Sequence, residues 1–499
     1  MEVEFDRTAM PCLQQVLRQM QSQEVTQEIR LPDSTPDVGK ILGCWGQVLI
    51  RSKEWHGRNV NMSGGVLAFV LYAPEGGSEV KTVDAWIPFQ MRWDIPESKR
   101  DGSLRLYGTI CSMDARSTSA GKILVRANVG MTAQALEPSQ AEVYAPCELP
   151  EDIQLLKHSY PVCIPVEAGE KPFSMEETLT VDAGKPDIEK VLGYEMQARI
   201  LDRKVMSEKV VFRGVATVRL IYGAEDGTVE CCTFEIPFSQ YSELEREYGQ
   251  NGETDVLIMP SSLEMELVGA DTVQMKAGLV GQYVIFDCPM IQVVEDAYSL
   301  KRNVRVAMQT LELPAVLDAG QETSKIQAET EVPGGDVIAS TFRAELPRIY
   351  KQADSIQTEM SGTFQTFYRG PDGKPETSID RWEATRSIPA DMDSDTQILL
   401  LPNTGADASI LGQKLKLQSE LCMEFQTRAG TGIPMAAGLT LGEETQPDPG
   451  RPSLVLRRAD EGGLWKLAKA YGSTVEAIRS ANHLTGEPEK GQFLLIPVS

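Results

Sequence analysis

Histidines and cysteines are the residue types best suited to catalysis or metal binding in this 499-residue chain, and their spacing argues against both roles. The three histidines, His56, His158 and His483, lie in widely separated regions. The nine cysteines contain no Cys-x-x-Cys spacing. Zinc and non-haem iron sites usually draw on clustered histidines, cysteines or carboxylates. The sequence therefore predicts no metal, no cofactor and no enzymatic activity.

The cysteines and the N-terminal residues also predict the compartment. An odd number of cysteines without paired spacing indicates reduced thiols rather than a disulfide framework. Residues 1–7 lack the basic start and apolar run of a secretory signal. No apolar stretch reaches the roughly 18–20 residues that a membrane span needs. We therefore expect a cytoplasmic protein without a transmembrane segment.

Charge is distributed unevenly along the chain. The net charge is −24, but residues 453–499 carry six basic and five acidic side chains, which leaves −25 on the remainder. An acidic body repels nucleic acids and anionic lipids, so neither is an expected partner. The nearly neutral C-terminal end has the charge balance of an interaction module.

The C-terminal 47 residues predict a small βααβ unit. Apolar residues recur at helical spacing from Leu464 to Tyr471, and Gly472 suits the left-handed position that ends a helix. Ser473 followed by Glu476 three residues later resembles a capping box, which predicts the start of a second helix. Short apolar runs on either side supply two strands, 454–456 and 493–497.

This unit resembles the LysM family, whose modules usually bind chains of N-acetylglucosamine. The residues that carry the resemblance are Trp465, Asn482, Leu484, Gly491, Ile496 and Pro497. Family members commonly enter the first helix through Gly-Asp-Thr-Leu-Trp, whereas this chain has Asp460-Glu461-Gly462-Gly463 before Leu464. The missing threonine removes a capping side chain, and Glu461 changes the charge of the expected groove.

These differences favour a protein partner over a glycan. Trp465 lies beside the apolar stripe, where it either covers the small core from the side or serves as an exposed aromatic anchor. A proline-rich tether, residues 446–452, would hold the module away from the rest of the chain. The predicted contact surface consists of Asp460, Glu461, Gly462, Gly463, Trp465, Asn482, His483 and Leu484.

Everything before the tether is organised by an internal repeat of about 150 residues. Residues 36–43, 64–72 and 87–89 recur as 186–193, 214–222 and 236–238. A more divergent third copy has residues 360–368 and Ile388-Pro389. Each copy ends in a strand of period-two alternation, which indicates a sheet with one buried face. The fold class is therefore mainly β, with three tandem antiparallel, sandwich-like repeats and a small C-terminal βααβ domain.

Two segments in the repeats have a specific structural prediction. Pro36-Asp37 and Pro186-Asp187 are expected to cap short helices, and the third copy has residues 318–323 at that position. Residues 295–298 are expected to connect two copies. The predicted units are 1–143, 144–292, 293–445, the linker 446–452 and the LysM unit 453–499.

Three such copies followed by one LysM module resemble the SipL-like spore-coat morphogenetic proteins, which carry SPOCS (spore coat) repeats. The resemblance implies a scaffold made in the mother-cell cytoplasm and recruited to the forespore surface. It also implies that the LysM module binds the ATPase of the coat's basement layer. Two alternatives remain: a LysM protein that binds peptidoglycan in the wall or cortex, and an enzyme whose site lies between repeats.

Overall fold

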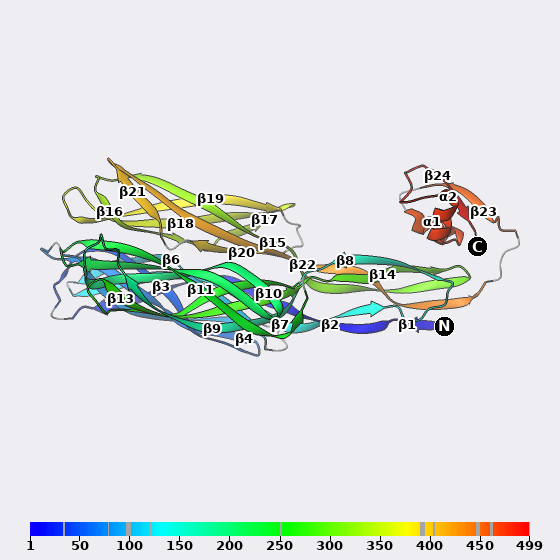
Figure 1. Ribbon diagram of the computed structural model, residues 1–499, viewed down its shortest axis with the longest axis horizontal. Helices are drawn as coiled ribbons and strands as arrows, with labels where there is room; N and C mark the ends of the chain where they lie inside the picture. Colours follow the sequence, from blue (N-terminus) through cyan, green and yellow to red (C-terminus); the bar gives the residue numbers. More distant parts are fainter. Residues whose placement is uncertain are drawn as a thin grey trace.

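The computed structural model describes residues 1–32, 35–77, 79–95, 101–119, 121–249, 252–389, 395–402, 405–445, 450–459 and 463–498. These residues form long antiparallel strands and two short helices near the C-terminus, so the predicted mainly-β class is confirmed. At one end of the molecule the strands of residues 336–411 lie above the strands of the first two copies, and a narrower stalk of strands extends to the other end (Figure 1). Neither helix is long and apolar enough to cross a membrane.

The first sandwich contains two three-stranded sheets. One sheet has the order β2-β7-β6, in which β7 pairs with both neighbours. The other has the order β3-β4-β5. Their bounds are β2 (Asp6–Arg30), β7 (Lys122–Ala145), β6 (Ser103–Ser119), β3 (Val38–His56), β4 (Asn59–Pro74) and β5 (Lys81–Asp94).

The second sandwich repeats this plan. Its first sheet has the order β12-β13-β9, and its second sheet is the pair β10-β11. β10 is long because it continues through Ser207, whose φ of 55° is left-handed, where the first sandwich has a turn between β3 and β4. The bounds are β9 (Ile164–Thr180), β10 (Ile188–Ala224), β11 (Val229–Tyr248), β12 (Gly252–Leu267) and β13 (Thr272–Asp287).

The third sandwich is built around one long strand, β22, which pairs with β15 on one side and with β20 and β21 on the other. Its second sheet is centred on β18, which pairs with β16, β17 and β19. The bounds are β15 (Arg302–Glu331), β16 (Asp336–Ala344), β17 (Arg348–Lys351), β18 (Ser355–Arg369), β19 (Pro375–Pro389), β20 (Asp395–Pro402), β21 (Asp407–Leu411) and β22 (Lys414–Glu444).

The alternating strands predicted at the end of each copy are confirmed. On β7, Ile123, Val125 and every second residue to Met131 are fully buried. β13 buries its alternate residues from Val273 to Leu279, and β22 buries Leu415 and Leu417. Burying one face of each strand against the opposite sheet provides the main stabilisation of each sandwich.

Three tyrosines occupy corresponding places in the three copies. Tyr72, Tyr222 and Tyr368 are all buried, each in a separate hydrophobic core. Each lies within two residues of the end of its strand, next to the following hairpin. Ile388-Pro389 is not equivalent to the Ile-Pro of the other copies. Pro88 pairs with Gly65 near the middle of β4, whereas Pro389 pairs with Ser355, the first residue of β18. The shared dipeptide in the third copy is therefore fortuitous.

The Pro-Asp segments do not cap helices, so that prediction was wrong. Val38 and Ile188 instead begin strands β3 and β10. The carbonyl of Asp37 accepts a hydrogen bond from Glu75 N–H at 2.9 Å, and that of Asp187 accepts one from Glu225 N–H at 3.1 Å. Each Pro-Asp segment thus begins a strand that pairs across the sheet, where a β-branched residue fits well.

The position of this segment in the third copy was also predicted wrongly. Residues 318–323 lie in the middle of β15 and pair with β22. In the third copy the segment that precedes the corresponding strand is Gly334-Gly335, and β16 begins at Asp336. Both glycines have positive φ, 108° and 123°, so the turn here needs a conformation that proline cannot adopt.

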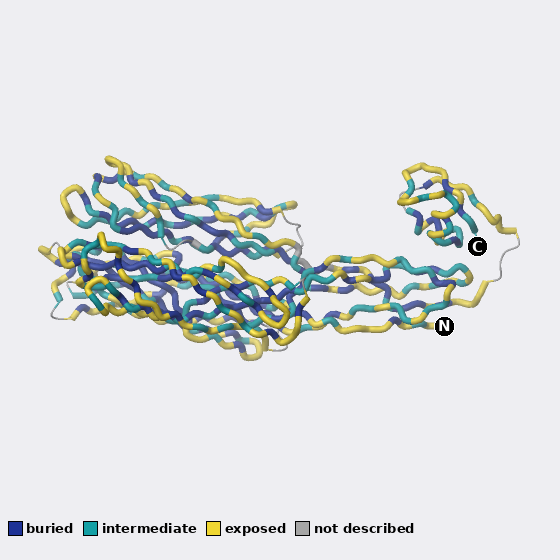
Figure 2. Tube along the Cα trace, in the orientation of Figure 1, coloured by how far each residue is buried: buried dark blue, intermediate teal, exposed yellow. Residues whose placement is uncertain are grey.

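The stalk is formed jointly by all three copies. The early part of β2 pairs with the late part of β7, β8 (Ile153–Pro161) pairs with β14 (Met290–Ser299), and the early part of β15 pairs with the late part of β22. The short strand β1 (Glu2–Glu4) adds to β22. Buried residues occur along the stalk (Figure 2), where they form two hydrophobic clusters. Its buried members come from each copy: Phe5, Cys12, Ala141, Ile153, Val162, Ile164, Ile291, Val293, Val294, Ala297, Leu311, Leu313, Ala315, Ile433, Met435, Ala436, Leu439 and Leu441.

Two predictions are corrected at the stalk. Residues 295–298 do not form a connector, because they lie within β14. Cys163 and Cys288 form a disulfide, so the prediction of reduced thiols was wrong for these two. The other seven cysteines are unpaired, and Cys231 and Cys232 are among them as expected for neighbours on opposite faces of a strand. The predicted domain boundaries stay a prediction.

Candidate interaction site

The C-terminal head has the predicted βααβ order. β23 (Leu454–Arg458) pairs antiparallel with β24 (Phe493–Pro497), and the helices α1 (Gly463–Tyr471) and α2 (Val475–Asn482) pack on them. The expected apolar stripe is inside, since Leu464, Leu467 and Ala468 are all buried. Ile478 supplies the buried face of α2. The head therefore has a small core of its own.

The turn between the helices differs from the prediction by one residue. Gly472 has the expected left-handed conformation, with a φ of 56°. The residue that caps α2 is Thr474, not Ser473, because the Thr474 hydroxyl accepts the Ala477 N–H at 3.0 Å. Ser473 is fully buried instead. The predicted capping box is therefore absent, and Glu476 lies in the first turn of α2, where its charge suits the helix dipole.

Three of the predicted contact residues, Asp460, Glu461 and Gly462, lie outside the described residues. Gly463 begins α1 with a φ of 68°. His483 ends α2 in a left-handed conformation and is exposed. Leu484 is half-buried and packs on the same small core as Trp465.

Asn482 holds the head together. Its amide Nδ2 donates to the carbonyls of Ile478, at 2.8 Å, and Leu495, at 2.6 Å. Its Oδ1 accepts the Leu495 N–H at 2.7 Å. These bonds tie the end of α2 to β24, so most of the hydrogen-bonding capacity of this side chain is used within the fold. The Asn482 side chain thus has a structural role, and any contribution to binding would come mainly from its neighbours.

Trp465 contacts the stalk. Its indole Nε1 donates to Oδ2 of Asp296 on β14 at 2.8 Å. One turn further along α1, Lys469 Nζ lies 2.7 Å from both carboxylate oxygens of Asp296. Residues four apart share one face of a helix, so both side chains reach the same carboxylate.

Tyr298, two residues after Asp296 on the same strand, completes the contact. Its ring lies edge-on to the Trp465 ring, with centroids 4.8 Å apart and an interplanar angle of 68°. Its hydroxyl donates to the Ser473 carbonyl at 2.7 Å, and the ring is part of the head's hydrophobic core. Edge-to-face aromatic pairs add to the stabilisation that burial alone provides.

The head is therefore docked on the stalk, and the prediction of a module held away from the repeats was wrong (Figure 1). Trp465 is neither a free anchor nor only a cover for the head's own core, because it lies between the head and β14. The outer face of the β23–β24 pair is left exposed instead. It carries Leu454, Leu456, Phe493 and Leu495, which are between 39% and 58% exposed.

Electrostatics favour the docked state at neutral pH. Partial burial raises the pKa of the Asp296 carboxyl, but hydrogen bonds from Lys469 and Trp465 outweigh this effect and hold the pKa below its usual value. A carboxylate whose pKa is depressed contributes stability above its unfolded pKa. That contribution is lost as the pH falls from the ordinary carboxyl range through the depressed pKa of Asp296.

We predict that Asp296→Ala will release the head from the stalk. The variant leaves Lys469 and the Trp465 indole without their shared acceptor, and small-angle scattering should show a larger maximum dimension at pH 7. Wild-type protein should keep the compact profile between pH 5 and 8 and lose it only under strongly acidic conditions. Glu295→Ala is a matched control on the same strand, since Glu295 bonds Tyr160 rather than the head. An unchanged profile for Asp296→Ala would show that this carboxylate does not hold the head.

Sequence reasoning did not find Asp296, Tyr298 and Lys469. Lys469 could have been found, because its spacing of four from Trp465 places both on one helical face. Asp296 and Tyr298 share one face of a strand in the sequence, but nothing in their spacing indicates a partner about 170 residues away. Only the fold brings them together.

A second candidate site lies where the three sandwiches meet. A cavity of about 260 Å³ is lined by residues of all three, including Arg105, Asp255 and Glu424. Arg105 bonds Asp255 at 2.8 Å, and Arg203 lies 3.3 Å from the other oxygen of Asp255. This cavity is a candidate for a site between repeats. The histidines take no part in it, because none of the three lines it.

Glu424 is the unusual member of this group. Burial and the nearby charge of Asp255 raise its pKa to about 7. The pKa of Asp255 is lowered in spite of its burial, because Arg105 and Arg203 stabilise its charge. Below about pH 7 and above the lowered pKa of Asp255, Glu424 is therefore mainly protonated while Asp255 is ionised, in one partly buried cluster.

Two segments of the chain match the models of known families. Residues 187–266, most of the second sandwich, match the SipL SPOCS domain. Residues 464–497, which contain both helices and β24, match the LysM domain. The chain thus carries a SipL-type SPOCS domain and a C-terminal LysM domain, as the sequence predicted. No curated protein and no solved structure matches it.

Proposed function

We propose that this protein is a non-enzymatic scaffold of spore-coat morphogenesis. The observation that carries the proposal is the presence of a SipL-type SPOCS domain and a LysM domain in one chain. Both are non-catalytic binding domains, and they indicate a role in sporulation. The joined stalk and sandwiches suit a scaffold, because they form a long, continuous structure with the LysM head at the far end (Figure 1).

We further propose that the head binds the ATPase of the coat's basement layer. The protein would be made in the mother-cell cytoplasm and recruited to the forespore surface by this contact. The head carries a net charge of +1 beside a body of −25, so an acidic partner is repelled less by the head than by the rest. The proposed contact surface is the predicted one, from residue 460 to Trp465 together with the 482–484 turn.

The docked position of Trp465 affects this proposal. A partner that uses Trp465 must displace Asp296 and Tyr298. Its apparent affinity is therefore the affinity for the undocked head multiplied by the fraction of heads that are undocked. A partner that uses the exposed β23–β24 face binds without displacing the stalk. The two modes can be distinguished by variants of the stalk, because only the first is strengthened when the head is released.

The experiment is co-purification of the full-length chain and a chain ending before residue 446 from sporulating cells. We expect the ATPase with the full chain only. Retention of the ATPase by the truncated chain would place the contact on the repeats instead. Retention by neither chain would contradict the proposed partner.

Peptidoglycan binding is the second candidate function, and the LysM match is the observation that favours it. The test is a pull-down of the full-length protein on purified peptidoglycan, with the ATPase as a competitor. Saturable binding to peptidoglycan together with no binding to the ATPase would favour this function. The reverse result would favour the scaffold.

A further inference from the structure

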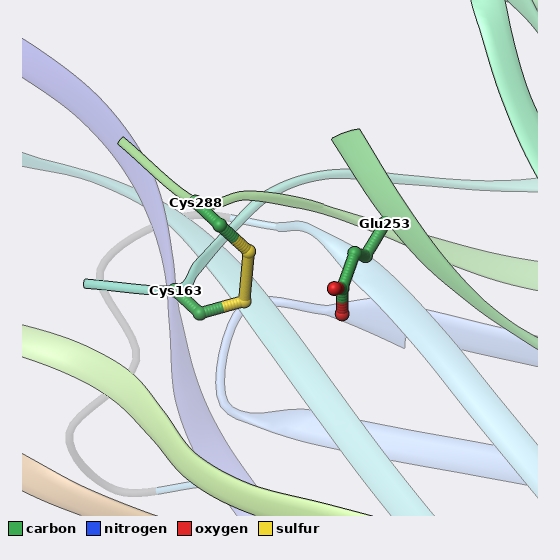
Figure 3. A group of neighbouring side chains, drawn as sticks. All are labelled: Cys163, Glu253 and Cys288. Carbon is green, nitrogen blue, oxygen red and sulfur yellow. A yellow bond between two sulfur atoms is a disulfide. The ribbon is translucent and has the colours of Figure 1, made fainter. Parts of the chain in front are cut away.

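Three possible metal ligands lie at one end of the first sheet of the second sandwich. The strand order there is β12-β13-β9. Glu253 is the second residue of β12, Cys288 follows the last residue of β13, and Cys163 precedes the first residue of β9. Neighbouring antiparallel strands bring these ends together. The two sulfurs and a carboxylate oxygen all lie within 4.8 Å of one another (Figure 3).

The backbone holds the two cysteines in place independently of the bond between them. The β9–β13 ladder ends at the pair Ile164 and Asp287, and the β8–β14 ladder starts at Pro161 and Met290. Each cysteine therefore lies between two paired strands: Cys163 between β8 and β9, and Cys288 between β13 and β14. The Cys163 carbonyl also accepts the N–H of Val316, on β15, at 2.7 Å. Opening the disulfide therefore leaves two thiols side by side next to Glu253.

We propose that the reduced form of this site binds one divalent ion of the zinc type. Cys163 and Cys288 would bind as thiolates and Glu253 as a carboxylate, which is a ligand set that favours zinc over magnesium or calcium. Zinc sites with three protein ligands take water in the fourth position. Cys163 and Glu253 line the cavity of about 260 Å³ between the sandwiches, which gives that water a place. Neither cysteine is fully buried, and Glu253 is exposed, so an ion can enter.

The chemistry couples metal binding to thiol redox state. A dithiol reductant transfers two electrons and two protons to the disulfide, so that the S–S bond breaks, two thiols form, and the reductant becomes a disulfide. The metal ion then displaces both thiol protons. The disulfide joins the ends of β9 and β13 only, whereas the metal also joins β12 through Glu253. The site is consequently either oxidised and metal-free or reduced and able to bind metal.

The test uses the full-length protein purified without a metal-affinity tag. One sample is left oxidised, and the other is reduced with a phosphine that is then removed under anaerobic conditions. Both are titrated with Zn²⁺ against a chromophoric chelator, and with Co²⁺ to detect the thiolate-to-cobalt charge-transfer band. We expect one Zn²⁺ per chain and the cobalt band in the reduced sample, and neither in the oxidised sample.

Variants identify the ligands. Cys163→Ser and Cys288→Ser should abolish the zinc stoichiometry and the cobalt band, and Glu253→Gln should weaken zinc binding by at least about tenfold, since even loss of an outer partner has that effect. Cys147→Ser is the control, because Cys147 is a half-exposed free thiol that bonds Glu4 elsewhere. Circular dichroism verifies that each variant folds. Three results would overturn the proposal: no zinc binding by the reduced protein, unchanged binding by Cys163→Ser, or a disulfide that the phosphine leaves intact in the folded chain.

Discussion

Replacing Trp465 with alanine should weaken binding of the proposed partner, the coat ATPase, by roughly 30-fold or more. Truncation of an aromatic residue at the centre of an interface typically costs about 2 kcal/mol or more, which corresponds to that change in affinity. The same substitution also removes the ring that contacts Tyr298 and the donor to Asp296. The measurement is a binding isotherm with the purified ATPase and the full-length chain.

Releasing the head from the stalk should leave the affinity for the ATPase unchanged or raise it, whereas removing a direct contact with the ATPase should lower it. Two variants therefore separate these effects. Asp296→Ala frees the head while keeping Trp465, so it should leave the affinity unchanged or raise it. If Asp296→Ala and Trp465→Ala weaken binding equally, the partner recognises the docked arrangement itself. Lys466→Ala is a control for an exposed position on the same helix.

The loop before α1 offers a second probe. Glu461 lies outside the described residues. We expect Glu461→Lys to alter a charged contact with the partner and to leave the head folded. Full retention of binding by folded Glu461→Lys and Trp465→Ala variants would exclude this surface. In that event Leu456→Asp and Leu495→Asp on the exposed β23–β24 face would be the next variants to measure.

Glu424→Gln should stabilise the three-sandwich body at pH 8 and have a much smaller effect at pH 5, where only the beginning of the loss is present. The pKa of Glu424 is raised in the folded protein to about 7, so the folded state binds a proton more tightly than the unfolded state does. A raised carboxyl pKa makes stability fall as the pH rises from the unfolded pKa to the folded one. The neutral amide escapes this loss, which amounts to about 3 kcal/mol for a shift of this size.

Urea denaturation at the two pH values measures the effect. Glu443→Gln is a control on the same strand, because Glu443 is exposed. An equal gain for Glu424→Gln at both pH values would show that the amide improves packing or hydrogen bonding rather than removing a buried charge. A gain at pH 5 alone would contradict the sign of the shift.

Local periodicity predicted much of the fold. Alternation in residues 123–131 identified a half-buried strand, since period-two burial appears directly in the residue types. Helical spacing from Leu464 to Tyr471 identified α1 for the same reason. The Pro-Asp segments were misassigned because a short apolar run such as Ile41-Leu42 fits a helix or a strand equally well. There, pairing with a distant strand decided the structure.

Long-range pairing explains most of what the sequence did not predict. The stalk depends on registers such as Glu312 with Gly432, which no local pattern encodes. Asp296 and the Cys163–Cys288 pair are likewise defined by contacts over more than 120 residues. The head was predicted more fully, because its core is local and its family pattern covers the whole unit. Its docking was missed because half of the contact belongs to another part of the chain.

The pairing of β1 with β22 also constrains how the protein is made. Glu2–Glu4 are synthesised long before their partners, Gly438 to Thr440. At about 5–20 residues per second, those partners are synthesised roughly 20 to 90 s later. Over that time the apolar faces that the first copy contributes to the stalk, such as Cys12 and Ala141, lack the part of their cover that Ile433 and Met435 supply. The nascent chain therefore exposes part of the stalk's apolar interior until the late part of β22 has been made.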